Sequence, residues 1–332
     1  MTRGTIMLTG ASGFVGGAVL RALLARGYAV QALVRDRERI APHEGVRVHQ
    51  GQLADADLVQ AACRGCTAVI HCAADYRLAL ARGDTERMIA ANVGGTWQVV
   101  DAARRAGAGR VVHCSTVGVL AFTRGGRVVD ETMVAGDPST LPGPYKRSKW
   151  AAEQLALAAA DVEVVAVLPS TPVGAGDVRP TPTGAVIRDF LRGRIPATVA
   201  TGLNCVDVEA VGRGHVDALE RGRPGRRYIL GDRNLWMAEL LRRVGWAGGR
   251  RPPRWRLPLA LAYAVAGASQ AVGRCRGEPP AVPLTAVRMA AHPMFVDAAR
   301  ARAELGWDPG DLDRALADAA AWFAGGPARR GA

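Results

Sequence analysis

The sequence is poor in aromatic residues and has no apolar segment as long as a membrane span. Only 5% of its 332 residues are aromatic, which argues against an aromatic-rich β sandwich, and 40 glycines favour close packing of helices on strands. A hydrophobic content of 49% excludes a disordered chain, and the composition also excludes a collagen and a disulfide-stapled miniprotein. The length predicts one large or two modest domains with a sizeable core.

Acidic residues are outnumbered, since 43 Lys and Arg oppose 30 Asp and Glu and leave a formal net charge of +13. A nucleic acid, an anionic membrane or a polyphosphate ligand would each suit this charge. Nucleic-acid-binding proteins concentrate their basic residues and interleave them with aromatics, whereas the arginines here are spread along the chain. We therefore expect no nucleic-acid partner and interpret most of the excess as a solvated surface.

Cysteine is scarce and is spaced poorly for a metal site. Of six cysteines only Cys63 and Cys66 form a C-x-x-C pair, with no second pair and no histidine at ligand spacing. We therefore expect no bound metal and reduced, mostly buried thiols. The first apolar run, residues 5–8, is too short for the core of a signal peptide, so the predicted location is cytoplasmic.

Short apolar runs alternate with helix-like segments through the first 170 residues. The predicted strands are residues 5–9, 29–34, 46–49, 68–72, 110–114 and 163–168. Parallel strands separated by helices require right-handed crossovers. The pattern therefore predicts an α/β fold over residues 1–170, a doubly wound parallel sheet of the Rossmann type that binds a dinucleotide.

Beyond residue 170 this alternation ends. Residues 171–332 are expected to form a smaller, irregular substrate-binding lobe, and the return of some of this chain to the sheet is left open. Helices are predicted at 184–193, 209–221 and 236–244. The strongly apolar segment 257–268 is shorter than a bilayer span, so we expect a buried or surface-docking helix there rather than a transmembrane one.

A glycine-rich segment joins the first predicted strand to the first predicted helix. In it Gly10 permits a tight turn, Gly13 lets backbone N–H groups approach a pyrophosphate, and Gly16 allows close packing of helix on strand. The helix N-terminus adds partial positive charge. The predicted cofactor-binding residues of this segment are Gly10, Ser12, Gly13, Phe14, Val15 and Gly16.

The end of the second strand predicts which dinucleotide binds. An acidic residue there bonds the ribose 2′-hydroxyl of NAD(H), whereas an arginine matches the 2′-phosphate of NADP(H). This chain has Arg35 at that position and Asp36 one residue later. We therefore expect NADP(H) to be preferred, while Asp36 leaves NAD(H) open.

Tyr145 and Lys149 stand four residues apart, so one face of a helix carries both. A phenol of ordinary pKa, about 10, is a weak acid at neutral pH, and a nearby ammonium favours its phenolate and lowers that pKa. Such a pair is common by chance. Here, however, it follows Ser115 and Thr116, which end a strand-like run where ligands bind in such sheets.

The order of glycine loop, hydroxyl residues and Tyr-x-x-x-Lys resembles the short-chain dehydrogenase/reductase superfamily. Residues 71–74 (His-Cys-Ala-Ala) and 92–96 (Asn-Val-Gly-Gly-Thr) resemble its extended branch. The resemblance implies that Tyr145 is the general acid, that Lys149 binds the nicotinamide ribose and lowers the pKa of the tyrosine, and that Thr116 orients the substrate oxygen.

The same resemblance implies further cofactor contacts outside the glycine loop. They are Arg35, Gln52, Leu53, Ala73, Ala74, Asn92, Tyr145, Lys149, Pro169 and Thr171. Thr116 stands where serine is commoner in the family, which keeps the hydroxyl. Gln52 stands where the family usually has Asp near the adenine, and its side-chain oxygen can still accept a hydrogen bond.

Nucleotide-sugar members of the extended branch carry an asparagine after the sixth strand, whereas residues 168–174 read Leu-Pro-Ser-Thr-Pro-Val-Gly. This run resembles dihydroflavonol reductase-like and 3β-hydroxysteroid dehydrogenase-like proteins instead. A wider likeness, to the hopanoid-associated HpnA family, covers nearly the whole chain. That family bears the label "sugar epimerase". Its likeness is carried by residues 73–78, 145–149, 180–184, 201–204 and 227–231.

These features favour an NADP(H)-dependent oxidoreductase that reduces a ketone or aldehyde on a bulky, hopanoid- or steroid-like small molecule. An NAD(P)-dependent sugar epimerase is the first alternative, and a non-catalytic dinucleotide-binding sensor is the second. Peripheral membrane contact and a homodimer are left open. The candidate substrate contacts are Asp75, Tyr76, Arg77, Ser115, Thr181, Thr183 and Asn204, for each of which a turn or cap is at least as common a role.

Overall fold

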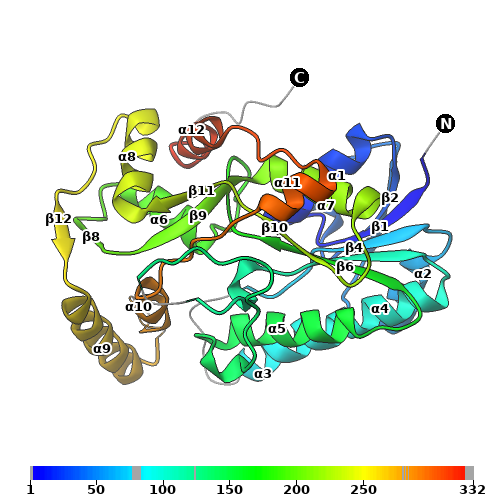
Figure 1. Ribbon diagram of the computed structural model, residues 1–332, viewed down its shortest axis with the longest axis horizontal. Coiled ribbons are helices and arrows are strands. Elements are labelled where there is room, and N and C mark those ends of the chain that lie inside the picture. Colours follow the sequence, from blue (N-terminus) through cyan, green and yellow to red (C-terminus); the bar gives the residue numbers. More distant parts are fainter. Residues whose placement is uncertain are drawn as a thin grey trace.

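The structure is a computed structural model that describes residues 3–76, 84–122, 125–278, 280, 282 and 284–325. Its main sheet has seven strands in the order β10-β6-β5-β4-β1-β2-β3 (Figure 1), and every pair in it is parallel. The strands are β1 (Thr5–Thr9), β2 (Ala29–Val34), β3 (Val46–Gln50), β4 (Ala68–His71), β5 (Arg110–Cys114), β6 (Glu163–Pro169) and β10 (Arg227–Leu230). The predicted fold class is confirmed, and the six predicted strands end within one residue of their predicted bounds.

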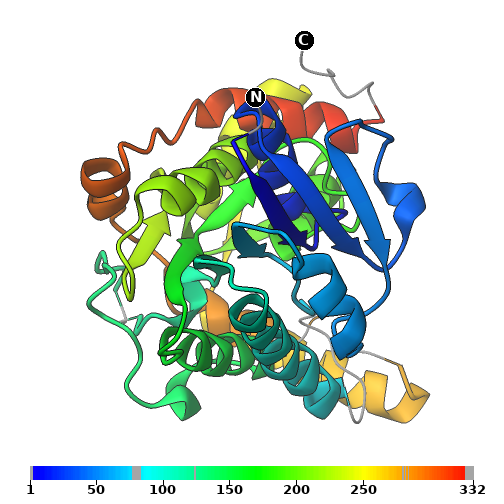
Figure 2. The same ribbon diagram turned by 90° about the vertical axis from the view of Figure 1, so that its right-hand side faces the viewer.

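Helices cover both faces of this sheet (Figure 2). On one face, α1 (Phe14–Ala25) packs on α7 (Val208–Arg221), which also contacts α11 (Ala299–Leu305). On the other, α4 (Gly95–Arg105) packs between α2 (Ala56–Cys63) and α5 (Pro144–Leu157).

The two apolar layers of the core follow from the alternation of the strands. Ile6 and Leu8 of β1 belong to one buried cluster and Met7 to the other, because successive strand residues point to opposite faces. All three side chains are buried. The short apolar runs of the sequence predict these strands well because both faces of a parallel sheet are covered.

Residues after β6 form a second, smaller group of elements around a third apolar cluster. Its strands are β7 (Thr171–Val173), β8 (Ala197–Val199), β9 (Gly202–Asp207), β11 (Arg233–Trp236) and β12 (Trp255–Leu257). Its helices are α6 (Pro182–Leu191), α8 (Met237–Gly248), α9 (Leu259–Arg276), α10 (Leu284–Ala290) and α12 (Leu312–Phe323). The expected helices at 184–193, 209–221 and 236–244 correspond to α6, α7 and α8.

Part of the second half of the chain returns to the main sheet. Residues 227–230 form β10, which pairs with β6, and α7 packs on α1. The boundary near residue 170 stays a prediction.

Because the main strands are parallel, their carboxyl ends lie along one edge, where ligands bind in open α/β sheets. The glycine loop after β1, the turn after β4 and the hydroxyl residues after β5 all meet this edge. Between α3 (Asp84–Ile89) and α4 the chain forms a π-helical turn at Ala90–Gly94. Such irregular turns are common at functional sites, and this one carries Asn92.

Candidate active site

The glycine loop has the geometry that a pyrophosphate cradle requires. Gly10 has φ +76°, and a Cβ on it would lie 2.8 Å from the backbone nitrogen of Ala73. A Cβ on Gly16 would collide with the carbonyl oxygen of Gly10. Helix α1 begins after Gly13 with no side-chain cap and no acidic residue in its first turn, so its first N–H groups stay available to an anion.

Arg35 and Asp36, at the end of β2, are both exposed but differ in their partners. The Asp36 carboxylate accepts a hydrogen bond from the Glu38 backbone at 3.1 Å, caps a short helical turn, and lies 3.9 Å from the Arg39 guanidinium. Within the described part of the chain, Arg35 forms no ion pair. The carboxylate is therefore engaged locally, whereas the guanidinium of Arg35 is available.

The two predicted adenine-side residues follow β3. Gln52 is exposed, and Leu53 packs toward α4, where a Cβ on Gly95 would lie 3.0 Å from the Leu53 side chain. Their contact with a cofactor stays a prediction, as does that of Pro169 and Thr171, which lie at the end of β6 and in β7.

A chain of hydrogen bonds holds the turn after β4. Thr9 Oγ1 accepts from the Ala73 backbone at 3.1 Å and contacts His71 at 2.7 Å, and His71 in turn contacts Thr96 at 3.1 Å. This network fixes Ala73, and with it Ala74, directly against the glycine loop, the position that the sequence predicted for a cofactor-contacting turn.

Asn92 links the same turn to α5, the helix that carries Tyr145. Its side-chain oxygen accepts from the Asp75 backbone at 2.7 Å, and its amide donates to the Asp75 carbonyl at 3.0 Å and to Ser148 Oγ at 2.9 Å. Ser148 donates in turn to the Tyr145 carbonyl at 2.8 Å. Asn92 is buried and its side chain bonds protein groups, so it positions this edge, while its predicted contact with a cofactor stays a prediction. Ser148 was not predicted, although it lies inside the Tyr145–Lys149 motif.

Tyr145 lies near the start of α5, with the ring of Tyr76 stacked on it at a centroid distance of 4.3 Å. Burial holds the pKa of the Tyr145 phenol well above its usual value, and the neighbouring Tyr76 and Cys114 add to this. Desolvation disfavours the phenolate and outweighs any lowering of this pKa, and the expected effect of Lys149 stays a prediction. A protonated phenol is the form that donates a proton.

Lys149 is buried one turn later and points at the end of β5. Its ammonium donates to the Cys114 carbonyl at 2.7 Å and lies 3.5 Å from His113 Nε2. Burial and the Lys149 charge hold the pKa of His113 well below its usual value, so that imidazole stays neutral. The positive charge of Lys149 therefore lies at the end of β5, two residues before Thr116.

Thr116 and Ser115 follow β5 beside α5. Thr116 Oγ1 accepts from the Gly118 backbone at 3.1 Å, which leaves its hydroxyl proton free to donate. The Ser115 hydroxyl is buried and has no hydrogen-bond partner among the described residues. The short helical turn Val117–Val119 contacts α5, which keeps these hydroxyls next to the Tyr145 helix.

Lys146 is a second buried amine that the sequence reasoning did not single out. Its ammonium lies 3.5 Å from the Met294 sulfur and 5.5 Å from the centre of the Phe122 ring, and burial lowers its pKa to about 8. It is 5% exposed and carries a charge at neutral pH in an apolar setting.

We expect Lys146→Met to stabilise the fold at pH 7. Below pH 8 the folded chain carries a charge that burial disfavours, and the difference from an unfolded pKa of 10.5 corresponds to about 3 kcal/mol. As pH rises from 8 to 10.5 the folded chain loses this proton before the unfolded chain does, so the wild type gains stability there. Denaturant unfolding at pH 7 and pH 10 measures this: the variant's advantage should shrink at pH 10, and an equal advantage at both would contradict the charge assignment.

The other predicted substrate residues differ in whether their side chains already have structural hydrogen bonds. Thr181 caps α6 by accepting from Gly184, and donates to Asp177, which is the structural role. Thr183 is half-buried in α6. Asn204 is 1% exposed and bonds Asn234 across β9 and β11, so we drop it from the substrate contacts. Asp75 lies in the turn that Asn92 holds, and Arg77 lies outside the described residues.

Four of the six cysteines form two groups. Cys63 and Cys66 are buried free thiols whose pKa burial raises to about 12 and about 11, so they are unreactive. Cys72, Cys114 and His215 bring their donor atoms within 4.8 Å of one another, which the sequence spacing did not predict. The Cys72 thiol bonds Cys114 and holds its pKa well below the usual value, an effect that the Lys149 charge strengthens. The buried Lys149 ammonium therefore favours a thiolate at Cys114.

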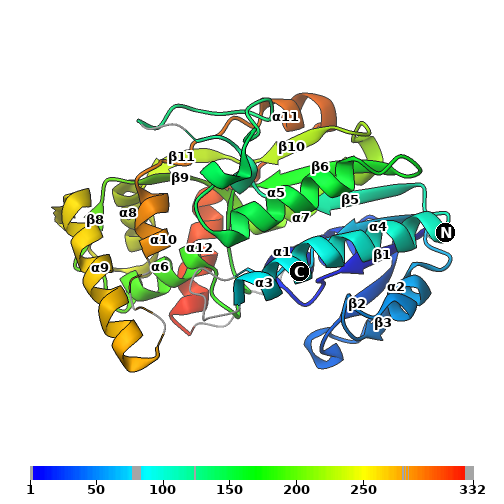
Figure 3. The ribbon, with the colours of Figure 1, turned by 90° about the horizontal axis from the view of Figure 1, so that it is seen from below.

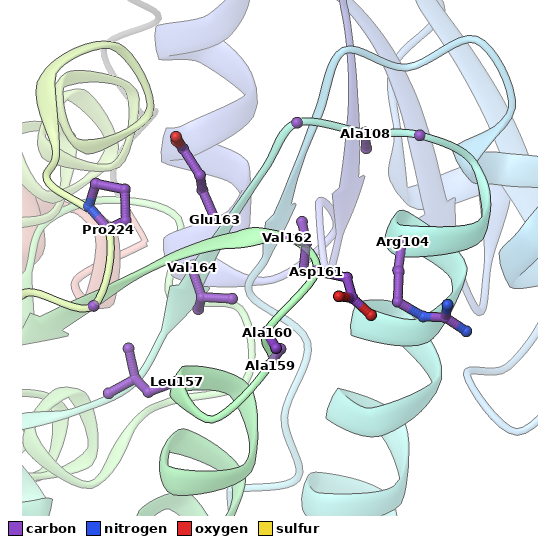
Figure 4. A pocket seen from close by; sticks show the side chains of 13 residues that line it. Arg104, Ala108, Leu157, Ala159, Ala160, Asp161, Val162, Glu163, Val164 and Pro224 are labelled. Atoms are coloured by element: carbon purple, nitrogen blue, oxygen red, sulfur yellow. The ribbon is translucent and has the colours of Figure 1, made fainter.

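A surface hollow of about 550 Å³ lies at the opposite edge of the main sheet (Figure 4). Residues before β5 and β6 line it, with Arg104, Asp161 and Glu163 as its charged groups. It contains none of the predicted site residues. The chemistry gathers instead at the carboxyl edge, around Tyr145.

Comparison with known proteins agrees with this arrangement. The profile of the family described as "NAD dependent epimerase/dehydratase family" matches residues 6–231. A Synechocystis protein named "Putative dihydroflavonol 4-reductase" is 39% identical over 324 residues, which are 95% of this chain and 93% of that protein. "Sterol demethylase protein B" of Methylococcus capsulatus is 31% identical over 96% of this chain and 98% of its own.

Among solved structures, the crystal structure of gox2253 is similar over 97% of this chain and 98% of that one. The TM-score is 0.85 and the sequence identity 40%. The likeness therefore extends over both the dinucleotide-binding sheet and the elements that follow it.

Proposed function

Because this chain belongs to the NAD-dependent epimerase/dehydratase family, as an enzyme of the extended short-chain dehydrogenase/reductase type, we propose that it reduces a ketone or aldehyde with NADPH. The substrate we propose is a bulky, apolar small molecule of hopanoid- or steroid-like character. The observation that carries the proposal is the protonated Tyr145 phenol of α5, with Lys149 one turn along the same helix and with Thr116 at the end of β5, directly before a short helical turn that contacts α5.

The glycine loop fits a dinucleotide. The positive φ of Gly10, the tight space at Gly16 and the uncapped start of α1 form a cradle for a pyrophosphate, and Ala73 closes its far side. When bound there, NADPH supplies a hydride to the substrate carbonyl carbon. Arg35 is the group proposed to hold the 2′-phosphate, since Asp36 is occupied in its own turn.

Two side chains of the protein act on the carbonyl oxygen of the substrate. Thr116 donates a hydrogen bond that orients this oxygen, and Tyr145 donates the proton that converts the developing alkoxide to an alcohol. The Lys149 charge eases the loss of that proton, because a nearby ammonium stabilises the phenolate that forms. Asn92 and Ser148 keep the helix in place during the transfer.

A sugar epimerase remains the second candidate, favoured by the matching family profile. An epimerase must keep NAD bound and return the hydride to the same substrate, whereas an arginine that selects NADPH suits net reduction.

The substrate lobe, proposed to begin near residue 171, includes Thr183 as the remaining candidate contact from α6. Free thiols support the proposed cytoplasmic location.

Replacing Arg35 with Ala tests the cofactor proposal. We expect NADPH to bind about 10- to 100-fold more weakly, the value of a charged hydrogen-bonded pair, with NADH affinity unchanged. Calorimetric titration with each dinucleotide measures this. Arg64→Ala is a matched control, because Arg64 is also exposed but lies after α2, away from the end of β2. Equal losses of NADPH and NADH affinity would make Arg35 an ordinary surface residue.

A further inference from the structure

Helix α9 presents several of its larger apolar side chains to solvent. At 100° per residue, its exposed positions fall on one arc that includes Leu261, Ala264, Val265, Ala268, Ala271 and Val272. The opposite arc carries Tyr263, Ser269 and Gln270, and the Ser269 hydroxyl accepts a hydrogen bond from the Val282 backbone at 3.0 Å. The buried positions of α9, Ala266 and Gly273, lie on this same side, so the helix packs through small residues and leaves its larger aliphatic side chains on the exposed arc.

The aliphatic side chains on the outer arc of α9 are about half exposed to solvent. Leu261 and Val265 are each 48% exposed and Val272 is 50% exposed. Helix α9 lies at the outer edge of the molecule with α10 beside it (Figures 1 and 3). A contiguous apolar patch of this kind marks an interaction site rather than a neutral surface.

Arginines flank the apolar face at both ends. Arg254 and Arg256 precede it on either side of Trp255, which is 77% exposed, and Arg274 and Arg276 follow it. None of these four forms an ion pair with a carboxylate within the described residues. An apolar face bounded by arginines and an exposed tryptophan is the pattern of a helix that lies in the headgroup region of a membrane.

We infer that α9 and β12 dock this protein on the surface of an anionic lipid bilayer, from which the enzyme takes an apolar carbonyl substrate. Across the described residues, no helix has the length and apolarity to cross a bilayer, so the helix lies on the surface. The docking itself rests on the surface alone, and the origin of the substrate rests on the proposed reductase function.

The charges favour a membrane over a second copy of the chain. Residues 250–276 contain six arginines and no acidic residue, so two such faces placed together would bring arginines against arginines. Anionic headgroups provide the opposite charge, and acyl chains accept the apolar side chains.

The docking face also lies close to the catalytic helix. Helix α10 packs on α9, and a Cβ on Gly143 would lie 2.8 Å from the Thr285 side chain of α10. Gly143 is the N-cap of α5, two residues before Tyr145. One helix therefore separates the proposed lipid surface from the start of the catalytic helix.

Vesicle flotation tests the docking. The full chain should float at low salt with vesicles of phosphatidylglycerol and phosphatidylcholine, and much less with phosphatidylcholine alone. Arg254→Gln with Arg256→Gln should weaken partitioning about 30-fold, at about 5-fold for each arginine. Leu261→Glu with Val265→Glu should abolish it, while Val128→Glu, a valine 48% exposed outside α9, should leave it unchanged.

Each outcome decides a separate point. Absence of flotation by the wild type, or equal flotation of the Leu261→Glu, Val265→Glu variant, would overturn the docking. A variant that turns a dimer into a monomer in light scattering while flotation persists would assign α9 to an interface between copies. Flotation without NADPH-dependent reduction of any apolar carbonyl would leave the docking intact and refute the reductase proposal instead.

Discussion

Replacing Tyr145 with Phe should lower turnover by about 10²- to 10⁴-fold and leave NADPH affinity unchanged, because the change removes only the proton donor. Phe keeps the aromatic ring and lacks the hydroxyl. The pKa of the wild-type phenol lies well above its usual value, so the group that the substitution removes is a proton donor. The measurement is kcat for NADPH oxidation beside a calorimetric titration of NADPH.

Tyr28→Phe is the matched control for that experiment. The Tyr28 hydroxyl donates to Glu220 at 3.2 Å, away from the carboxyl edge of the sheet, so this substitution also removes one phenolic hydroxyl but leaves the candidate site unchanged. Turnover close to that of the wild type in Tyr28→Phe, together with the loss in Tyr145→Phe, assigns the proton to Tyr145. Near-normal turnover of Tyr145→Phe would refute the assignment.

A second large effect is expected at the start of α1. Gly16→Val should weaken binding of NADPH and of NADH alike, by about 10- to 100-fold, because the new side chain collides with the Gly10 carbonyl and displaces the loop. The loss should appear in both dinucleotides, unlike that of Arg35→Ala, since the pyrophosphate is common to them.

The next residue provides a control for Gly16→Val. A Cβ on Gly17 would lie 3.6 Å from its nearest neighbours, an ordinary contact, so Gly17→Ala should bind both dinucleotides as the wild type does. Thermal unfolding of both variants separates a local change from a loss of fold. A folded Gly16→Val protein with unchanged NADPH affinity would contradict the pyrophosphate cradle.

Features formed by consecutive residues, such as most strands of the main sheet and the glycine loop, could be predicted from the sequence. Six of the seven strands of the main sheet were predicted because their apolar runs are buried on both faces, and the glycine loop because its residues are consecutive, whereas β10 was not predicted. The three-residue strands β7, β8 and β12 were missed, because so short a segment carries no periodicity.

Contacts between distant segments could not be predicted in this way. The bond from Asn92 to Ser148 joins residues 56 apart, and the trio of Cys72, Cys114 and His215 gathers only when α7 packs on the sheet. The direction of the Tyr145 pKa was also missed. The four-residue spacing of Tyr145 and Lys149 suggested a pKa lowered by the ammonium. Burial raises the pKa instead, and spacing does not reveal burial.

The structure gives different surroundings to different arginines of this basic chain. Several arginines are paired on the surface, as Arg26 is with Asp217 and Glu220. Arg35 is proposed to serve the cofactor, and the arginines around α9 the membrane. The solvated surface expected from the sequence therefore accounts for part of the +13, and two proposed anionic partners account for specific arginines.

The most direct test of the proposed function is the stoichiometry of cofactor use. The purified wild type is incubated with NADPH and a panel of steroid-like, flavonoid-like and hopanoid-linked sugar carbonyl compounds, and both the NADPH consumed and the alcohol formed are quantified. The proposal predicts one NADPH oxidised for each alcohol formed, with Tyr145→Phe strongly reduced. Conversion of a sugar to its epimer with no net oxidation of the dinucleotide would contradict it and establish the epimerase instead.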